Sequence, residues 1–336
     1  MRSTVVGAAV LAVVGGVALA APFIAPNPPD EQFREYLYAP PMRPHVVDED
    51  GKLHAPFVYS LQLVDRLDRR FDEDRSHRRP LVCFSGGHLV QVGDPTRGPL
   101  LLFGADQLGR DVFARLVLGA RPSLAVALLA AAVALMIGAL WGAVAAVAGG
   151  FTDEVLMRTA DFVLVLPALY VVLALRSVTP LVLSPLAIFG LMVGVFAVVG
   201  WPYVARGVRA IVSSELKTDY TLAARAVGVT KWRLLTKHLL PASRGFLAIQ
   251  GTLLVPGFIL AEATLSFVGL GFSDQTASWG VMLQDASNIR AIAEFPWLLS
   301  PAAAIVLVVL GVNLLARGTP GHEPLQWILR QTTTKP

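Results

Sequence analysis

Cysteine and charge are the two scarce features of this sequence. Cys83 is the single cysteine among 336 residues, so no disulfide can form within the chain. We expect this thiol to be buried like a small apolar side chain. Only 15% of the residues are Asp, Glu, Lys or Arg, whereas 54% are hydrophobic and the mean hydropathy is +0.60. Because soluble domains carry about 25% charged residues, the composition excludes an ordinary soluble domain and indicates an integral membrane protein.

Motifs for nucleotide hydrolysis and nucleophilic catalysis are also missing. A phosphate-binding loop reads G-x-x-x-x-G-K-[ST], but the only Gly-Lys pair, Gly51-Lys52, is followed by Leu53. The G-x-S-x-G motif does not occur. The histidines at positions 45, 54, 77 and 88 have neither metal-ligand spacing nor a triad context. We therefore predict no catalytic residue, no metal site and no cofactor bound by this chain.

Long apolar runs are what the sequence has in abundance. A helix needs about 20 apolar residues to cross the ~30 Å hydrocarbon core of a bilayer. Six runs approach that length, at residues 4–24, 122–148, 161–175 with an extension from Met157, 185–205, 246–268 and 296–316. We predict an all-α polytopic membrane protein with six transmembrane helices.

The N-terminal run, residues 1–24, has two interpretations. It is long enough for a retained transmembrane helix, which we predict. Arg2, a short apolar core and the small-residue pattern Ala18-Leu19-Ala20 also fit a cleavable signal peptide, which would leave five spans.

Lysine and arginine gather in the loops on one side of the predicted spans. These are Arg206, Arg209, Lys217, Arg225, Lys231, Arg233, Lys237 and Arg244 before span five, and Arg317, Arg330 and Lys335 after span six. The loops on the opposite side hold only Arg176 and Arg290 among their short segments. Because positive loops stay in the cytoplasm, we predict that both termini, the tail 317–336 and the loop 206–245 are cytoplasmic. Residues 25–103 are then extracytoplasmic.

The extracytoplasmic insertion, residues 25–103, is polar and begins with clustered prolines. Asp50-Gly51 is a hairpin signal, flanked by strand candidates at Val46-Val47 and Leu53. Residues 61–71 repeat apolar side chains with helical spacing, and residues 90–103 could add a strand. We predict a small α+β insertion.

A helical stripe precedes the second span. Leu108, Val112, Phe113, Leu116 and Val117 lie on one face of residues 104–121, which predicts an interfacial helix that ends where the membrane helix begins at Pro122. This structural role outweighs a catalytic one for Asp106 or Asp111. The core of five helices then spans residues 122–316.

The cytoplasmic loop contains two short helices by its capping signals. Thr218 is an N-cap candidate, Asp219 suits the first turn, and Gly228 can take the left-handed conformation that ends a helix. Thr230 can cap a second helix over residues 231–240, which Pro241 should close. A basic loop that touches only lipid headgroups is the alternative, but that would not require the regular spacing of small residues.

That spacing resembles a known motif. Residues 222–228, LAARAVG, followed after nine residues by His238-Leu239-Leu240-Pro241, resemble the EAA motif of ABC importer permeases. Leu222 stands where glutamate is common, and His238 where an aliphatic residue is common. Residues 104–124 and 262–286 look like the C-type permease of the dipeptide/oligopeptide/nickel branch. The resemblance covers residues 104 to about 318, and the insertion is longer than usual.

The resemblance implies a function and a set of partners. The loop would dock on cytoplasmic ATPase subunits, which bind the ATP, and would couple their closure to the spans. The residues implied are Asp219, Tyr220, Ala223, Ala224, Arg225, Gly228, Lys231, Trp232 and Pro241. A second homologous permease would complete the pathway, and an extracytoplasmic binding protein would deliver the substrate, with the assembly in a bacterial inner membrane. The branch carries dipeptides, oligopeptides, glutathione-like compounds or nickel, and the sequence does not choose among them.

Charges, glycines and prolines within the spans are the remaining signals. Glu262 and Asp161 are carboxylates in or near the membrane, where ionisable groups are costly and often functional. Glu262 either faces the pathway or bonds within the bundle, and Asp161 either lines the pathway or anchors the helix end. Gly190, Gly194 and Gly257 permit close helix approach, and Pro167, Pro202 and Pro256 should bend or end helices.

Two other functional classes are alternatives to an importer subunit. An ion- or proton-coupled secondary transporter usually shows internal repeats and embedded coupling sites, and no internal repeat is evident. A membrane-anchored enzyme would need a nucleophile and a base in the insertion, and its scattered histidines do not supply them.

Overall fold

The computed structural model describes residues 2–48, 51–66, 69–94, 98–167, 170–171, 173–174, 183–287 and 289–316. The chain divides into two compact units. Unit 1 comprises residues 1–11, 126–260 and 308–336, and unit 2 comprises residues 12–125 and 261–307. The boundaries fall within four helices, α1 (Arg2–Leu19), α3 (Val112–Ala148), α10 (Arg244–Phe267) and α13 (Ser300–Ala316).

Four segments of the described chain are long and apolar enough to cross a membrane: α3, α6 (Pro185–Glu215), α10 and the segment Pro296–Ala316, which joins η4 (Pro296–Leu299) to α13. They confirm four of the six predicted spans as apolar helices. The first predicted span is helical from Arg2 but ends at Leu19. At this end the Arg121 guanidinium donates to the carbonyl oxygens of Ala18 and Leu19 at 2.6 Å each. A separate short helix, α2 (Ala21–Ile24), follows.

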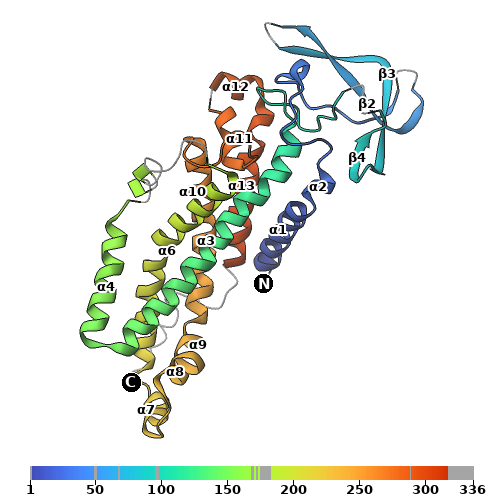
Figure 1. The fold of residues 1–336 in the computed structure, drawn as a ribbon. Coiled ribbons are helices and arrows are strands. Elements are labelled where there is room, and N and C mark those ends of the chain that lie inside the picture. The colour runs from blue at the N-terminus through green and yellow to red at the C-terminus, as the bar shows by residue number, and fades with distance from the viewer. Residues whose placement is uncertain are drawn as a thin grey trace, which may run out of the picture. The chain divides into compact units, whose positions relative to one another are not determined.

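The third predicted span begins earlier than expected, as α4 (Gly150–Val165). Gly149 and Gly150 have φ of 66° and 53°, a left-handed conformation that lets the chain turn directly from α3 into α4. The helix ends just before Pro167, as predicted, and residue 175 lies outside the described residues. Pro202 and Pro256, by contrast, lie inside α6 and α10. Figure 1 shows α4 beside α6.

The α3 and α6 backbones pack closely in unit 1 because of glycines on α3. A Cβ atom at Gly142 would lie 2.1 Å from the Ala205 carbonyl oxygen, and one at Gly138 would lie 2.6 Å from that of Trp201. The prediction that Gly190, Gly194 and Gly257 mediate close approach is wrong within this chain, since a Cβ at each would meet no described atom within 4 Å. The apolar character of a span does not show which of its glycines lies against a neighbouring helix.

The insertion in unit 2 is a four-stranded antiparallel sheet in the order β1-β2-β3-β4 (Figure 1). Its strands are β1 (His45–Val47), β2 (Leu53–Asp65), β3 (Arg70–Ser85) and β4 (His88–Val92), preceded by one short turn, η1 (Arg34–Tyr36). Val58, Leu61, Val92, Leu100 and Leu101 form its core. The strands predicted at residues 46–47 and 53 are confirmed, and of the strand expected within residues 90–103 only residues 90–92 are found, in β4. Asp50 of the predicted hairpin lies outside the described residues.

Two predictions about the insertion are wrong. The helix expected over residues 61–71 is the end of β2 and the start of β3, because Leu61 is buried while Gln62 and Val64 are exposed, the alternation of a strand. Cys83 is exposed on β3 instead of buried. Over so few residues, the spacing of apolar side chains does not distinguish the period of a helix from that of a strand.

The helix expected over residues 104–121 also differs. Residues 104–111 form a tight turn, bridged between Ala105 and Asp111, and α3 starts only at Val112. A Cβ at Gly109 would lie 2.2 Å from the Phe33 carbonyl oxygen, so this turn packs on the chain entering the sheet. Pro122 lies inside α3, so neither does a helix end there nor does the membrane helix begin there. Prolines are tolerated in membrane helices when neighbours satisfy the freed backbone groups.

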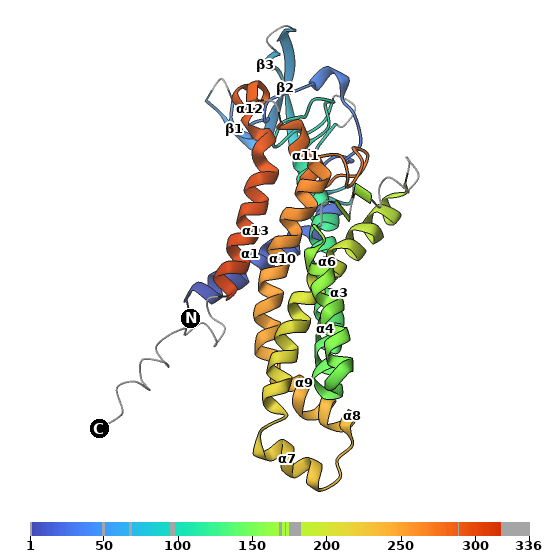
Figure 2. The ribbon, with the colours of Figure 1, turned by 90° about the vertical axis from the view of Figure 1, so that its left-hand side faces the viewer.

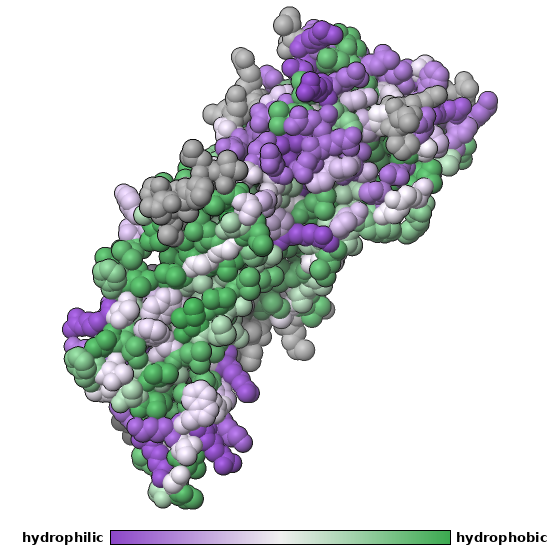
Figure 3. Space-filling view, in the orientation of Figure 1, coloured by the Kyte–Doolittle hydropathy of each residue, from purple (hydrophilic) through white to green (hydrophobic). Residues whose placement is uncertain are grey.

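The surface over the long helices and the surface over the strands differ in hydropathy. In Figure 3 the surface over the long helices is mostly hydrophobic, whereas the surface over the strands is mostly hydrophilic. Exposed apolar side chains on α3, α4 and α6 include Leu128, Met136, Phe162 and Leu186. Such a helix surface suits lipid or another membrane helix.

We expect Gly142→Ala to destabilise unit 1 by about 1–3 kcal/mol, because the new methyl group overlaps the Ala205 carbonyl and forces the helices apart. Gly194→Ala is the matched control, since its methyl group meets no described atom. The measurement is the unfolding temperature of each purified variant in detergent. An equal unfolding temperature for both variants would contradict the close packing.

Candidate functional site

The loop between α6 and α10 folds as two short helices. The first, α7 (Asp219–Ala226), begins after Thr218 as predicted. The Thr218 hydroxyl donates to the Glu215 carbonyl at 2.7 Å instead of accepting from α7, so this residue occupies the cap position without making the cap bond. Gly228 has φ of 84°, which confirms the left-handed turn after α7. Figure 2 shows α7 and α8 as a pair of short helices beyond the end of α6.

The second helix is longer than predicted and does not stop at Pro241. It begins with α8 (Lys231–Leu234), where the Thr230 hydroxyl accepts from the Arg233 backbone N–H at 3.4 Å. It continues as a π-helical turn, η3 (Leu235–Leu239), and as α9 (Leu240–Ala242). Pro241 cannot make an i→i−4 bond, and the π-helical turn before it already interrupts that pattern. The predicted closure at Pro241 is therefore wrong.

Buried leucines fasten the second helix to the membrane helices of unit 1. Leu234, Leu235 and Leu239 are each at most 4% exposed. They share one apolar core with Ala139 and Ala143 of α3 and with Val204, Val208 and Val212 of α6. A displacement of α8 must therefore move these helices or break the core.

The opposite face of the loop is open. Tyr220, Leu222, Val227 and Trp232 are exposed by 47%, 50%, 86% and 68%. Of the predicted docking residues, Asp219, Ala223, Arg225, Gly228 and Lys231 are exposed as well. Ala224 and Pro241 are half-buried, and Ala224 packs against the leucine core. The structure thus brings seven of the nine docking candidates to the surface of one helix pair.

The two intramembrane carboxylates belong to different units. Glu262, in unit 2, is fully buried, and its Oε1 accepts from the Ser266 hydroxyl at 2.9 Å, which agrees with a bond inside the bundle. Asp161, on α4 in unit 1, lies 3.5 Å from the Arg206 guanidinium on α6. Together with Asp153 and Arg209 it lines a cavity of about 390 Å³. A pathway role for either carboxylate stays a prediction.

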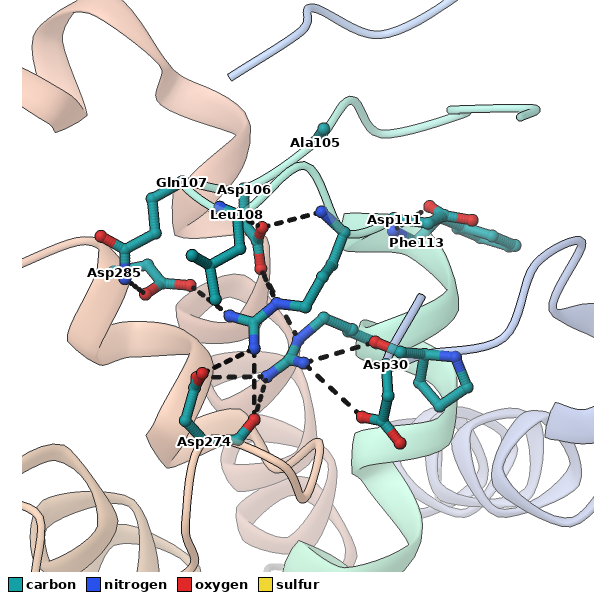
Figure 4. A network of polar contacts seen from close by, with 12 residues as sticks. Asp30, Ala105, Asp106, Gln107, Leu108, Asp111, Phe113, Asp274 and Asp285 are labelled. Atoms are coloured by element: carbon teal, nitrogen blue, oxygen red, sulfur yellow. Dashed lines mark hydrogen bonds and ion pairs between the residues drawn. The ribbon is translucent and has the colours of Figure 1, made fainter. Parts of the chain in front are cut away.

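Sequence reasoning missed a buried polar network in unit 2 (Figure 4). The Arg110 Nε donates to Asp106 at 2.6 Å and its Nη1 to Asp274 at 2.9 Å. The Arg115 side chain, 1% exposed, donates to the Asp274 carbonyl at 3.4 Å. Gln107 binds Asp285 at 2.6 Å, so the network joins the turn at 104–111 to α11 (Trp279–Asp285) and the loop before it. The only signal in the sequence was the regular spacing of arginines and aspartates at residues 106–115.

Burial changes the pKa values of ionisable groups in this network. Desolvation raises the pKa of Asp285 to about 6, with the Asp106 carboxylate adding to the effect. Burial lowers the pKa of Arg110, but its contacts with Asp106 and Asp274 more than offset this and the net shift is upward. Within the described residues, no group of three His, Cys, Asp or Glu side chains is suited to a metal ion. Because Gln107 and Arg110 bind Asp285 and Asp274, the network acts as a clamp between two segments distant in the sequence.

Asp111 gives this region a testable pH dependence. Burial raises its pKa to about 7, although Asn27 and the backbone N–H groups of Ala114 and Phe113 favour the carboxylate. Since the folded state holds a proton that the unfolded state has lost, the free energy of unfolding should fall as pH rises from about 4 to about 7, by up to about 1.4 kcal/mol per pH unit. Asp111→Asn stays neutral and should lack this component.

The measurement is the unfolding temperature of both proteins across that pH range. Asp72→Asn, at an exposed strand carboxylate, is the control and should follow the wild type. Parallel curves for the wild type and Asp111→Asn would contradict the assignment.

Comparison with known proteins places the chain in a family. Residues 134–318 match the model of the binding-protein-dependent transport system inner membrane component, and residues 2–41 match the N-terminal transmembrane domain of oligopeptide transport permease C. The oligopeptide transport system permease protein OppC of Bacillus subtilis is 38% identical over 217 residues, which cover 64% of this chain and 68% of that protein. The dipeptide transport system permease protein DppC of the same organism is 39% identical over 218 residues, 64% of this chain and 66% of that protein.

A third relative is the probable D,D-dipeptide transport system permease protein DdpC of Escherichia coli, 34% identical over 216 residues, 64% of this chain and 70% of that protein. The loop with α7 and α8 and most of the long helices fall inside the family match. The chain belongs to the family of binding-protein-dependent transport system inner membrane components, the permease subunits of ABC importers.

Proposed function

We propose that this permease carries dipeptides or oligopeptides and takes its driving force from two cytoplasmic ATPase subunits bound at the exposed face of α7 and α8. A second, homologous permease completes the pathway, and an extracytoplasmic binding protein delivers the peptide. The relatives named for oligopeptide and dipeptide transport support this substrate class. The excess of Lys and Arg in residues 206–245 supports a cytoplasmic loop and cytoplasmic termini.

One observation carries the coupling proposal: the helix pair is anchored on one face and open on the other. The leucine core joins α8 to α3 and α6, so force applied to the exposed face reaches the membrane helices. The open face offers two exposed aromatic side chains, Tyr220 and Trp232, with Arg225 and Lys231 beside them. Interfaces draw most of their binding energy from aromatic and arginine side chains of this kind.

We expect Trp232→Ala to weaken association with the ATPase subunits by at least about tenfold, because an exposed tryptophan at an interface centre contributes about 2 kcal/mol or more. The assay is co-purification of the ATPase subunits with the permease from membranes. Phe151→Ala is the control, since Phe151 is 82% exposed at the start of α4, outside the loop. If Trp232→Ala retains the ATPase subunits as well as the wild type does, Trp232 does not belong to the coupling site.

Transport should depend on ATP and not on an ion gradient. Proteoliposomes that contain both permeases and the ATPases should take up a labelled tripeptide when ATP and the binding protein are supplied. Collapse of the proton gradient with an uncoupler should leave the initial rate unchanged, because the ATPases supply the energy. Uptake that survives ATP depletion and stops with the uncoupler would overturn the proposed mechanism in favour of a secondary transporter.

A further inference from the structure

The inserted sheet of unit 2 carries a cavity that neither the family match nor the coupling proposal explains. It measures about 720 Å³. Arg34 of η1, Arg66 after β2 and Arg69 before β3 line it, together with the polar side chains Tyr36, Ser60 and Gln62. We call this cavity the arginine pocket.

The arginine pocket has an unbalanced charge. Among the described residues that line it, Glu35 is the one acid, against three arginines. A neighbouring cavity of about 610 Å³, lined by Arg43 and Arg75 and by Asp72 and Glu73, is charge-balanced. The excess of positive charge therefore belongs to one pocket and is not a general property of the sheet.

The three guanidinium groups also form no ion pair or side-chain hydrogen bond within the described residues. No described carboxylate forms an ion pair with Arg34, Arg66 or Arg69, whereas Arg78 binds Asp48 at 2.8 Å and Arg110 binds Asp106. Arg69 has φ of 49°, a left-handed conformation in the turn between β2 and β3.

We propose that the arginine pocket receives an acidic surface segment of the extracytoplasmic substrate-binding protein. This inference rests on the proposed function, in which that protein delivers the peptide. Guanidinium groups bind carboxylates through paired N–H donors, and Ser60 and Gln62 add neutral hydrogen-bonding groups. The position on an insertion outside the helices suits a partner that approaches from solvent.

A protein surface fits the pocket better than a small anion does. Arg34 and Arg66 are exposed, and an exposed ion pair is too weak to hold a small carboxylate. In a protein interface the same charges accelerate association and fix orientation, while the surrounding contact area supplies the affinity. The pocket should thus determine docking rate and its salt dependence more than substrate choice.

The test uses the assembled transporter in nanodiscs of zwitterionic lipid and the purified binding protein. Association is measured by interferometry at about 50 mM and about 300 mM salt, so that electrostatic attraction is weakly and strongly screened. The variants are the triple charge reversal of Arg34, Arg66 and Arg69 to Glu and the milder triple change to Gln. Arg43→Glu, at an exposed arginine of the charge-balanced cavity, is the matched control.

We expect the triple Glu variant to associate at least about tenfold more slowly at low salt and to lose most of the salt dependence. The Gln variant should lie between it and the wild type, and Arg43→Glu should resemble the wild type. Wild-type association by both triple variants, or an equal loss in Arg43→Glu, would overturn the inference. If the variants lose binding only to anionic lipid vesicles, the pocket binds lipid headgroups and the inference is wrong.

This experiment separates the inference from the proposed function. A wild-type complex that neither retains ATPases nor responds to the binding protein would contradict the proposed function itself. Normal ATPase retention and peptide uptake, combined with unaltered docking of the arginine variants, would contradict only the inference.

Discussion

The packing of three leucines against α6 is the interaction on which the functional part of the molecule depends. Leu234, Leu235 and Leu239 are buried among apolar side chains of α3 and α6, so the exposed helix pair and the membrane helices share one core. Closely packed interiors respond to displacement as a unit and do not deform continuously. Without this core, a partner bound at α7 and α8 would move only the loop.

The sequence predicted most of the helical core and the position of the loop. Long apolar runs at α3, α6, α10 and residues 296–316 needed no tertiary information, because their length alone suits a membrane. The cap position at Thr218 and the glycine at Gly228 located α7 in the sequence. The left-handed residue that ends a helix is a local requirement, which Gly228 meets. The prediction that Pro241 ends the second helix failed, because the π-helical turn before it depends on how the leucines pack.

The polar parts of unit 2 were harder to predict, for a physical reason. Whether residues 61–65 form a strand depends on pairing with β3, a partner that spacing does not reveal. The aspartates and arginines of residues 106–115 were interpreted as an interfacial helix, yet their partners, Asp274 and Asp285, lie more than 150 residues later. Burial of Arg115 is tolerated because the nearby Asp106 and the distant Asp274 lie 3.9 and 4.0 Å from its guanidinium group.

That polar clamp has a consequence for the order in which the protein matures. Arg110 and Arg115 are synthesised long before Asp274 and Asp285, so among these partners only Asp106 is present when the arginines are made. Unit 2 can close around them only once the chain up to residue 285 has been made and inserted. Unit 2 therefore completes its fold near the end of translation, and a chain that stops before residue 274 leaves Arg110 and Arg115 without two of the carboxylates that surround them.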